Sequence, residues 1–228
     1  MEESRRGFIL GSSAALAGTI IAPVGTLPAL QTKKGQPSEE EDVSTNEDLM
    51  REHGVLNRVL LIYDEANRRI STGKPDLDPQ IVTKAAGLIK KFIEEYHEKL
   101  EENYLFPRFE KANKLADLTR VLRAQHAAGR TATDRIISSV KSKDLDAATT
   151  AMTAFVRMYR PHEAREDTVL FPALHSIVSK HEYDALGEEF DKIEQKTFGG
   201  DGFDMAVDQV TALEKQMGIY DLSQFTPK

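Results

Sequence analysis

The chain has 228 residues, of which 40% are hydrophobic and 29% charged, and its formal net charge is −7. This composition is typical of one or two compact domains, and the acidic balance argues against a nucleic-acid partner or a general binder of anionic membranes. The sequence contains no cysteine, which excludes disulfides, iron–sulfur clusters, thiolate zinc sites and cysteine nucleophiles. Any metal must therefore be held by nitrogen and oxygen ligands.

Residues 1–31 have the features of an export signal. A charged start precedes an uncharged stretch, residues 7–32, that is rich in Gly, Ala and Ser. Residues 4–9, SRRGFI, resemble the twin-arginine (Tat) motif, and the pair Arg5-Arg6 makes the resemblance specific. It implies export of a folded protein to the periplasm or another extracytoplasmic space. The apolar part, residues 8–22, is shorter than the ~20 residues of a spanning helix, so we expect no stable transmembrane anchor.

The rest of the chain divides into a linker, a domain and a tail. Residues 32–45 are polar and charged and contain a proline, which is typical of a solvated linker. The domain is predicted at residues 46–198. The C-terminal extension, residues 199–228, contains a short amphipathic segment at about 204–217, which we expect to fold back on the domain or to contact a partner.

The domain is predicted to be all-α. Amphipathic patterns indicate helices at roughly 46–70, 79–106, 115–142 and 145–178, with a further one at 182–196. We expect Asp144 to cap the fourth helix, and Pro107 and Pro172 to stop the helices that they follow. Short connections between long amphipathic helices favour an antiparallel up-down four-helix bundle, here with a short C-terminal helical extension.

Each predicted helix places one histidine in its apolar stripe. These are His53, His97, His126 and His162, and two glutamates, Glu101 and Glu166, follow the second and fourth of them by one helical turn. Burial of an imidazole or carboxylate without a partner costs a few kcal/mol. Something must therefore compensate all six groups.

The second and fourth helices share a longer pattern. The segment H-E-x-x-E-x-x-x-L-F-P begins at His97 and recurs at His162, 65 residues further on. The first and third helices are related more weakly, through His53 and His126 at an offset of 73 residues. The domain is therefore expected to consist of two similar helical hairpins around a common axis.

The spacing within the repeat indicates a metal site. Residues i and i+4 share one helix face, so each His can turn a nitrogen, and each Glu a carboxylate, toward the same point. Four imidazoles and two carboxylates are a ligand set for two transition-metal ions. Glu98 and Glu163 lie about 100° around the helix from the histidines, and are candidates for additional ligands or outer hydrogen-bond acceptors. The pattern is not the zinc-protease H-E-x-x-H.

The order His, H-x-x-x-E, His, H-x-x-x-E over residues 46 to about 198 resembles the hemerythrin-like (HHE cation-binding) domain. The resemblance implies a four-helix bundle with a non-haem di-iron centre of two iron ions. By that resemblance His53 and His97 serve one iron, His126 and His162 serve the other, and Glu101 and Glu166 bridge them. Because nitrogen and oxygen ligands accept several first-row ions, manganese or a mixed pair is an alternative.

The third helix departs from the oxygen-carrying hemerythrins. Their third helix resembles H-x-x-x-H, whereas Leu122 and Arg130 stand four residues from His126 here. The smaller histidine share argues against reversible oxygen storage. We therefore expect an exported protein that binds or reacts with a small diatomic or peroxide ligand (oxygen, peroxide or nitric oxide). The alternative is a non-enzymatic iron- or oxygen-responsive sensor or oxygen-binding protein. Enzymatic turnover and the redox partner stay open.

Overall fold

The computed structural model describes residues 43–73 and 77–227. The chain from Ser44 to Lys228 is one compact unit, and all regular structure in its described part is helical. The predicted signal, residues 1–31, and most of the predicted linker lie outside the described residues. None of the described helices combines the length and the apolar character that crossing a membrane requires.

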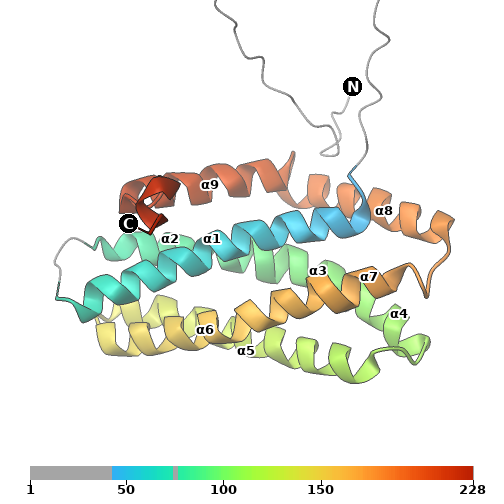
Figure 1. The fold of residues 1–228 in the computed structure, drawn as a ribbon, viewed down its shortest axis with the longest axis horizontal. Helices are drawn as coiled ribbons and strands as arrows, with labels where there is room; N and C mark the ends of the chain where they lie inside the picture. The colour runs from blue at the N-terminus through green and yellow to red at the C-terminus, as the bar shows by residue number, and fades with distance from the viewer. Residues whose placement is uncertain (1–42, 74–76, 228) are drawn as a thin grey trace, which may run out of the picture. The chain divides into compact units, whose positions relative to one another are not determined.

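Four long helical segments pack side by side into a bundle (Figure 1). The first and third are single helices, whereas the second and fourth are each assembled from α-helix and wider π-helical turns (η). In chain order the segments are α1 (Thr45–Ser71); α2 (Pro79–Leu88), η1 (Ile89–His97), α3 (Glu98–Leu100), η2 (Glu101–Leu105) and α4 (Phe106–Lys111); α5 (Ala116–Lys141); and α6 (Leu145–Arg165), η3 (Glu166–Leu170) and α7 (Phe171–Leu174).

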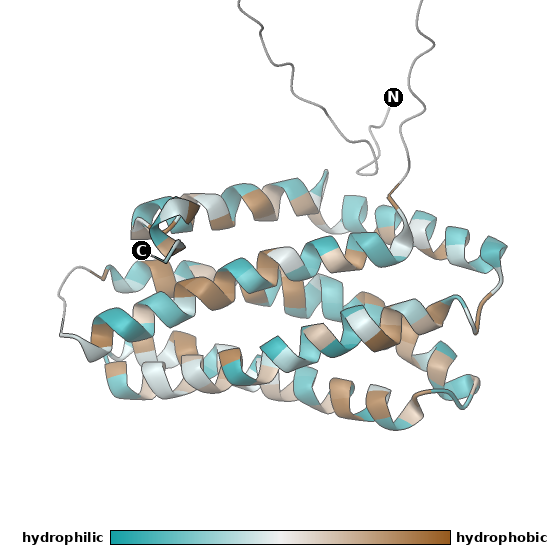
Figure 2. Cartoon of the chain, in the orientation of Figure 1, coloured by the Kyte–Doolittle hydropathy of each residue, from teal (hydrophilic) through white to brown (hydrophobic). Residues whose placement is uncertain are grey.

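Side-chain caps define where several helices begin. The Asp144 carboxylate accepts a hydrogen bond from the Ala147 N–H at the start of α6, as predicted, and Ser44 caps α1 in the same way. Such caps satisfy one of the N–H groups that the first turn leaves unpaired, and each contributes ~1 kcal/mol. Between the helices, the apolar faces turn inward and the hydrophilic faces outward (Figure 2). Large buried side chains such as Tyr63, Phe106 and Phe171 fill the core.

Neither Pro107 nor Pro172 stops its helix, so that prediction was wrong. Both prolines lie just after the start of a further α-helix, α4 or α7, and directly behind a π-helical turn. In that turn the Phe106 N–H bonds to the Glu101 carbonyl, five residues back. A π turn opens the ladder of hydrogen bonds, and a proline is tolerated where its missing N–H and its ring meet no i−4 partner. The same turn begins at both glutamates of the repeat.

The C-terminal part of the chain packs on the bundle. The fourth segment ends at Leu174, before the predicted residue 178, and α8 (Lys180–Phe198) and α9 (Gly202–Met217) follow. α9 lies against α1 and α2 (Figure 1). The Arg58 guanidinium on α1 donates to Glu214 on α9 over 3.0 Å. The tail therefore folds back on the domain, which is one of the two outcomes expected for it.

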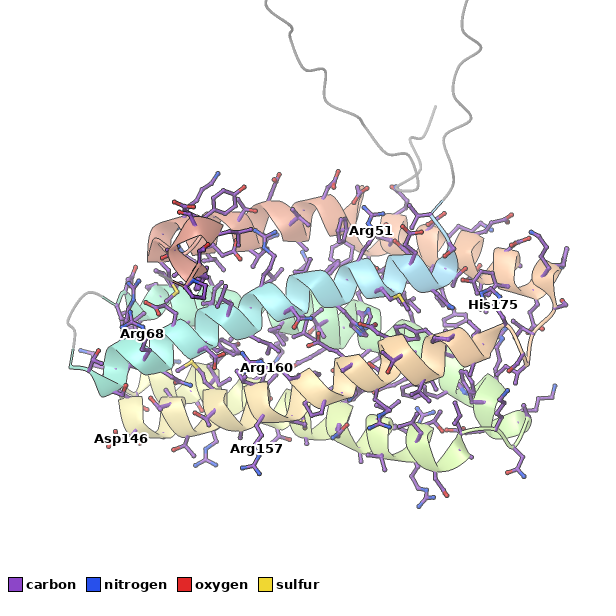
Figure 3. All side chains as sticks on the ribbon, viewed as in Figure 1. Arg51, Arg68, Asp146, Arg157, Arg160 and His175 are labelled. Carbon is purple, nitrogen blue, oxygen red and sulfur yellow. The ribbon has the colours of Figure 1, made fainter. Side chains whose placement is uncertain are left out.

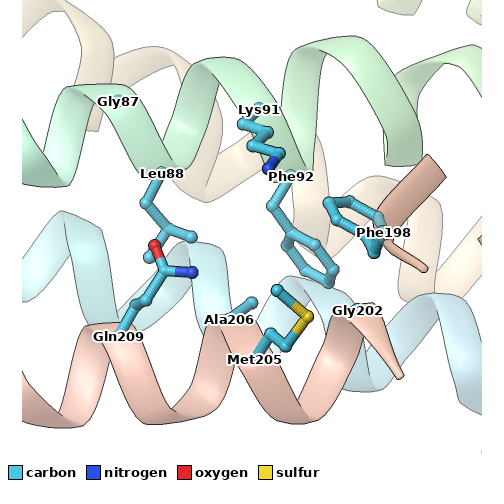
Figure 4. A pocket seen from close by; sticks show the side chains of 9 residues that line it. All are labelled: Gly87, Leu88, Lys91, Phe92, Phe198, Gly202, Met205, Ala206 and Gln209. Carbon is cyan, nitrogen blue, oxygen red and sulfur yellow. The ribbon is translucent and has the colours of Figure 1, made fainter. Parts of the chain in front are cut away.

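A small crevice separates α9 from the second segment. Leu88, Lys91 and Phe92 line one side, and Met205 and Gln209 line the other (Figure 4). Its volume is about 40 Å³, enough for a few water molecules. None of the predicted metal ligands lines it.

Candidate metal centre

The six predicted ligands converge from all four long segments into the centre of the bundle. Every one of them is at most 3% exposed. They form two clusters, in each of which the potential ligand atoms lie within 4.8 Å of one another. We call these the first half-site and the second half-site; the first contains His53, His97 and Glu101, and the second contains His126, His162 and Glu166.

Glu101 lies between the two half-sites. Its Oε2 atom is 3.8 Å from Nε2 of His97, on its own helix, and 3.3 Å from Nε2 of His126 in the second half-site. Two ligand atoms that bind the same metal ion at ~2.1 Å and at right angles to each other are about 3 Å apart. The spacing therefore suits ligands that share a metal ion.

Glu166 occupies the equivalent position on the fourth segment. Its Oε2 atom is 3.0 Å from Nε2 of His162, one turn earlier, and 3.4 Å from Nε2 of His53 in the first half-site. Each carboxylate thus faces one imidazole from each half-site. Each carboxylate is therefore close to potential ligand atoms of both half-sites.

Five of the inward-facing ligand atoms have no hydrogen-bond partner among the described residues. Both carboxylate oxygens of Glu101 and of Glu166, and Nε2 of His126, are buried without a hydrogen-bond partner in the described part of the chain. The Nε2 atoms of His53 and His97 face each other at 3.0 Å. When Nδ1 carries the ring proton, both Nε2 atoms present lone pairs, which attract each other only through a cation between them. The donor set therefore fits metal ions.

Each imidazole directs its other ring nitrogen, Nδ1, to an outer oxygen acceptor. Such an acceptor fixes the tautomer and turns Nε2 toward the metal position. The four pairs are His53 with Asp167 (2.7 Å), His97 with Glu52 (2.6 Å), His126 with Glu102 (3.1 Å) and His162 with Gln125 (2.9 Å).

These four acceptors were not predicted from the sequence, although it contains a signal for them. Glu52 and Gln125 directly precede a predicted ligand, and Glu102 and Asp167 directly follow one. Glu52 and Gln125 are related by the 73-residue offset of the internal repeat, and Glu102 and Asp167 by its 65-residue offset. A polar residue that recurs beside a ligand in both halves of a repeat is therefore a candidate acceptor.

Two phenylalanines of the repeat clamp the histidines of neighbouring helices. Phe106 stacks on the ring of His126 with centroids 5.5 Å apart, and Phe171 stacks on His53 at the same distance. The L-F-P segments therefore do more than fill the end of the bundle, because they restrict how these two imidazoles can turn.

Glu98 and Glu163 lie beside the ligand set, each with its own partner. The Tyr159 hydroxyl donates to Glu98 over 2.6 Å, and Arg130 lies 2.8 Å from the same carboxylate. Asn57 donates to Glu163. One oxygen of Glu163 is nevertheless buried without a hydrogen-bond partner among the described residues, and Glu98 forms a third metal-capable group with Glu102 and His126. Both residues therefore stay candidates for additional ligands or outer groups. Tyr159 also packs edge-on against His162, with ring centroids 5.3 Å apart.

The electrostatics of the centre favour positive charge. Burial lowers the pKa of His126, but the neighbouring carboxylates of Glu101 and Glu102 outweigh it and raise the pKa to about 10. Burial opposes the charged form of His53 in the same way, yet Asp167 and Glu166 hold its pKa well above the usual value. Without a metal, the centre would therefore attract protons instead.

The two central carboxylates differ in their electrostatics. Burial raises the pKa of Glu101, and the nearby charge of Glu166 raises it further. Burial also acts against the charged form of Glu166, but His162 and His53 lower its pKa below the ordinary range. Two buried carboxylates this close need cations to be ionised together.

The two histidines outside the pattern lie on the surface. His175 and His181 are both exposed. His175 follows α7 directly (Figure 3). Its ring packs against the ring of Tyr183 at a centroid distance of 4.1 Å. Neither belongs to the clusters described above.

Comparison with known proteins agrees with this geometry. Residues 44–174 match the family model of the hemerythrin HHE cation-binding domain, and the chain belongs to that family. It is 44% identical to the uncharacterized proteins Rv1995 of Mycobacterium tuberculosis and Mb2018 of Mycobacterium bovis, over 97% of this chain and 91% of each relative. No solved structure matches it significantly.

Gly129 on α5 makes room for Tyr159 beside the centre. A Cβ atom at residue 129 would lie 2.0 Å from the Tyr159 hydroxyl oxygen. Although Gly→Ala inside a helix normally gains roughly 0.5–1 kcal/mol, we expect Gly129→Ala to lower the free energy of unfolding by ~1–3 kcal/mol, as overpacking does. Urea unfolding measures the difference.

Gly54 on α1 is the matched control, because a Cβ atom there would meet nothing within 4 Å. Gly54→Ala should stabilise the protein slightly. Adding Tyr159→Phe to Gly129→Ala should recover part of the loss. Equal stability of the two alanine variants would contradict the close packing of Tyr159 on Gly129.

Proposed function

We propose that this protein is exported and carries a carboxylate-bridged non-haem di-iron centre that reacts with a small oxidant such as oxygen, peroxide or nitric oxide. One observation carries the proposal: each of two buried carboxylates, Glu101 and Glu166, faces an imidazole of both half-sites. The fold proposed for this centre is the antiparallel up-down four-helix bundle of the hemerythrins. Manganese or a mixed metal pair would suit the same ligands.

The chain's own residues would hold, orient and enclose the metals. The imidazole Nε2 atoms and the two carboxylates supply the ligands, and the outer acceptors at Nδ1 keep the imidazoles in the ligating tautomer. When bound, two irons supply one-electron redox chemistry and positions for small ligands. Because the six side chains are at most 3% exposed, only a small molecule could reach the centre without unfolding part of the bundle.

The third segment supports redox chemistry over oxygen carriage. At the position one turn after His126, Arg130 contacts the carboxylates of Glu98 and Glu102 and therefore cannot serve as a ligand. One turn earlier Leu122 is buried and apolar. The centre thus has four imidazoles and two carboxylates, and the larger carboxylate share favours higher metal oxidation states.

A metal- or oxygen-responsive binding protein without turnover is the second candidate. It is favoured by the unpaired buried oxygens of Glu101 and Glu166, since such groups make the stability of the bundle depend on the metal. Turnover of peroxide by the iron form would support the first candidate. Metal-dependent ordering without turnover would support the second.

Export is proposed from the sequence of residues 1–31. The Arg5-Arg6 pair and the uncharged stretch after it support the Tat route, which would place the protein in the periplasm or another extracytoplasmic space. The acidic net charge gives no support for nucleic-acid binding.

The di-iron centre predicts two irons per chain after anaerobic reconstitution, with a near-ultraviolet charge-transfer band after exposure to oxygen. Glu101→Gln or Glu166→Gln should lose most of both irons, because each removes a bridge. His53→Ala or His126→Ala should lose mainly one. Elemental analysis together with the optical spectrum measures both effects.

Glu95→Gln changes an exposed residue of the second segment, which also carries Glu101. This variant is the control and should retain two irons. Fewer than about one iron in the unmodified chain would refute the centre. Equal, small losses in all four ligand variants would refute the bridged arrangement.

The export proposal predicts that full-length protein accumulates outside the cytoplasm in a host with a working Tat pathway. Changing Arg5 and Arg6 to lysine should leave most of it inside, because the paired arginines are the recognised feature. Cell fractionation and immunoblotting measure the distribution. An unchanged distribution would contradict Tat export.

A further inference from the structure

The two halves of the centre are built on one plan, but several outer positions break that plan, and three of these breaks change a charge that contacts a ligating imidazole or its hydrogen-bond acceptor. The offsets of the repeat pair Glu52 with Gln125, Asn57 with Arg130, and Lys99 with Ala164. Each break changes the charge around one half-site only. All three make the surroundings of the second half-site less negative than those of the first.

The first break lies in the hydrogen bonds to the ligating imidazoles. In the first half-site both acceptors, Glu52 and Asp167, are carboxylates, at 2.6 and 2.7 Å from Nδ1. In the second half-site the acceptor for His162 is the neutral amide oxygen of Gln125, at 2.9 Å. A carboxylate acceptor makes the imidazole a more basic ligand than an amide does.

The second and third breaks add cations beside the second half-site. Glu98, Glu102 and His126 have ligand atoms within 4.8 Å of one another. Arg130 contacts both of these carboxylates, and Lys99 pairs with Glu102. The negative charge of Glu98 and Glu102 is therefore partly neutralised where it would otherwise stabilise a metal ion in the second half-site.

The equivalent positions around the first half-site carry no cation. The counterpart of Arg130 is Asn57, which donates a neutral hydrogen bond to Glu163. The counterpart of Lys99 is Ala164, which carries no charge and lies one helical turn before Asp167. A metal in the first half-site would thus be close to one more carboxylate acceptor than a metal in the second, without the cations at the Arg130 and Lys99 positions.

We propose that the two metal positions are unequal, and that the first half-site binds metal at least about tenfold more tightly than the second. The inference rests on the two-metal centre proposed above. Changes to outer groups of a metal site typically alter affinity ~10–100-fold, and three changes here act in the same direction. Loading is then sequential, and the second half-site is the position that exchanges its metal.

Anaerobic titration of the metal-free protein with Co²⁺, followed by visible absorption and calorimetry, tests this directly. The unmodified protein should take up two equivalents in two resolved steps. Gln125→Glu together with Arg130→Asn copies the first half-site into the second. It should bring the two affinities to within a few-fold of each other, mainly by strengthening the weaker step.

The reciprocal change, Glu52→Gln with Asn57→Arg, should weaken the tighter step by ~10-fold or more. Gln125→Glu alone keeps the side-chain shape and covers the case in which a double variant folds poorly. Arg157→Asn is the control, since this side chain is exposed on the outer face of α6 (Figure 3) and its removal should leave both steps unchanged.

Two equivalents bound with the same affinity would overturn the inference and leave the two-metal centre intact. A ratio of the two affinities that Gln125→Glu with Arg130→Asn leaves unchanged would also overturn it. One equivalent that Glu52→Gln weakens would contradict the two-metal centre while agreeing with the preference for the first half-site. One equivalent that Gln125→Glu strengthens, or no binding at all, would contradict both.

Discussion

Burial of ionisable groups in a helical core is the constraint on which this structure depends. Glu101 and Glu166 are completely buried, and their oxygens have no hydrogen-bond partner among the described residues. Leaving such groups unpaired costs several kcal/mol, a large fraction of the stability of a domain. Metal ions at the centre would remove that cost. The same residues would thus supply the site of reaction and couple metal binding to stability.

The internal repeat shows how the bundle positions this centre. The π turns begin at the two central glutamates and allow the chain to continue helically through Pro107 and Pro172. This continuation places the phenylalanine of each L-F-P segment on the imidazole of a neighbouring helix. One repeated segment therefore provides a ligand pair, an outer acceptor and an aromatic clamp, and its second copy completes the other half.

Much of this was predictable from the sequence, because it depends on local periodicity. The histidine stripes and the i, i+4 pairs located the helices and the six converging side chains, and Asp144 correctly marked the start of α6. The π turns were not predictable, because they depend on which carbonyl each N–H reaches. Proline rules alone therefore placed a stop at Pro107 and at Pro172, where the helical path continues.

The hydrogen-bond partners around the ligands show a second limit of prediction from the sequence. Nothing in a single helix tells which helix's imidazole Glu102 will accept from, because that depends on how the segments pack. The contact of Arg130 with Glu98 and Glu102 is likewise tertiary. The packing of α9 through Arg58 and Glu214 depends on residues 156 positions apart, beyond the reach of any local pattern.

The most direct measurement is the free energy of unfolding with and without Fe²⁺ under anaerobic conditions, for the unmodified chain and for a variant carrying both Glu101→Gln and Glu166→Gln. A metal at 100 times its dissociation constant should stabilise the unmodified chain by ~2.7 kcal/mol. The variant should gain nothing from metal, because it lacks both central carboxylates. An equal gain from metal in the variant and in the unmodified chain would contradict the account.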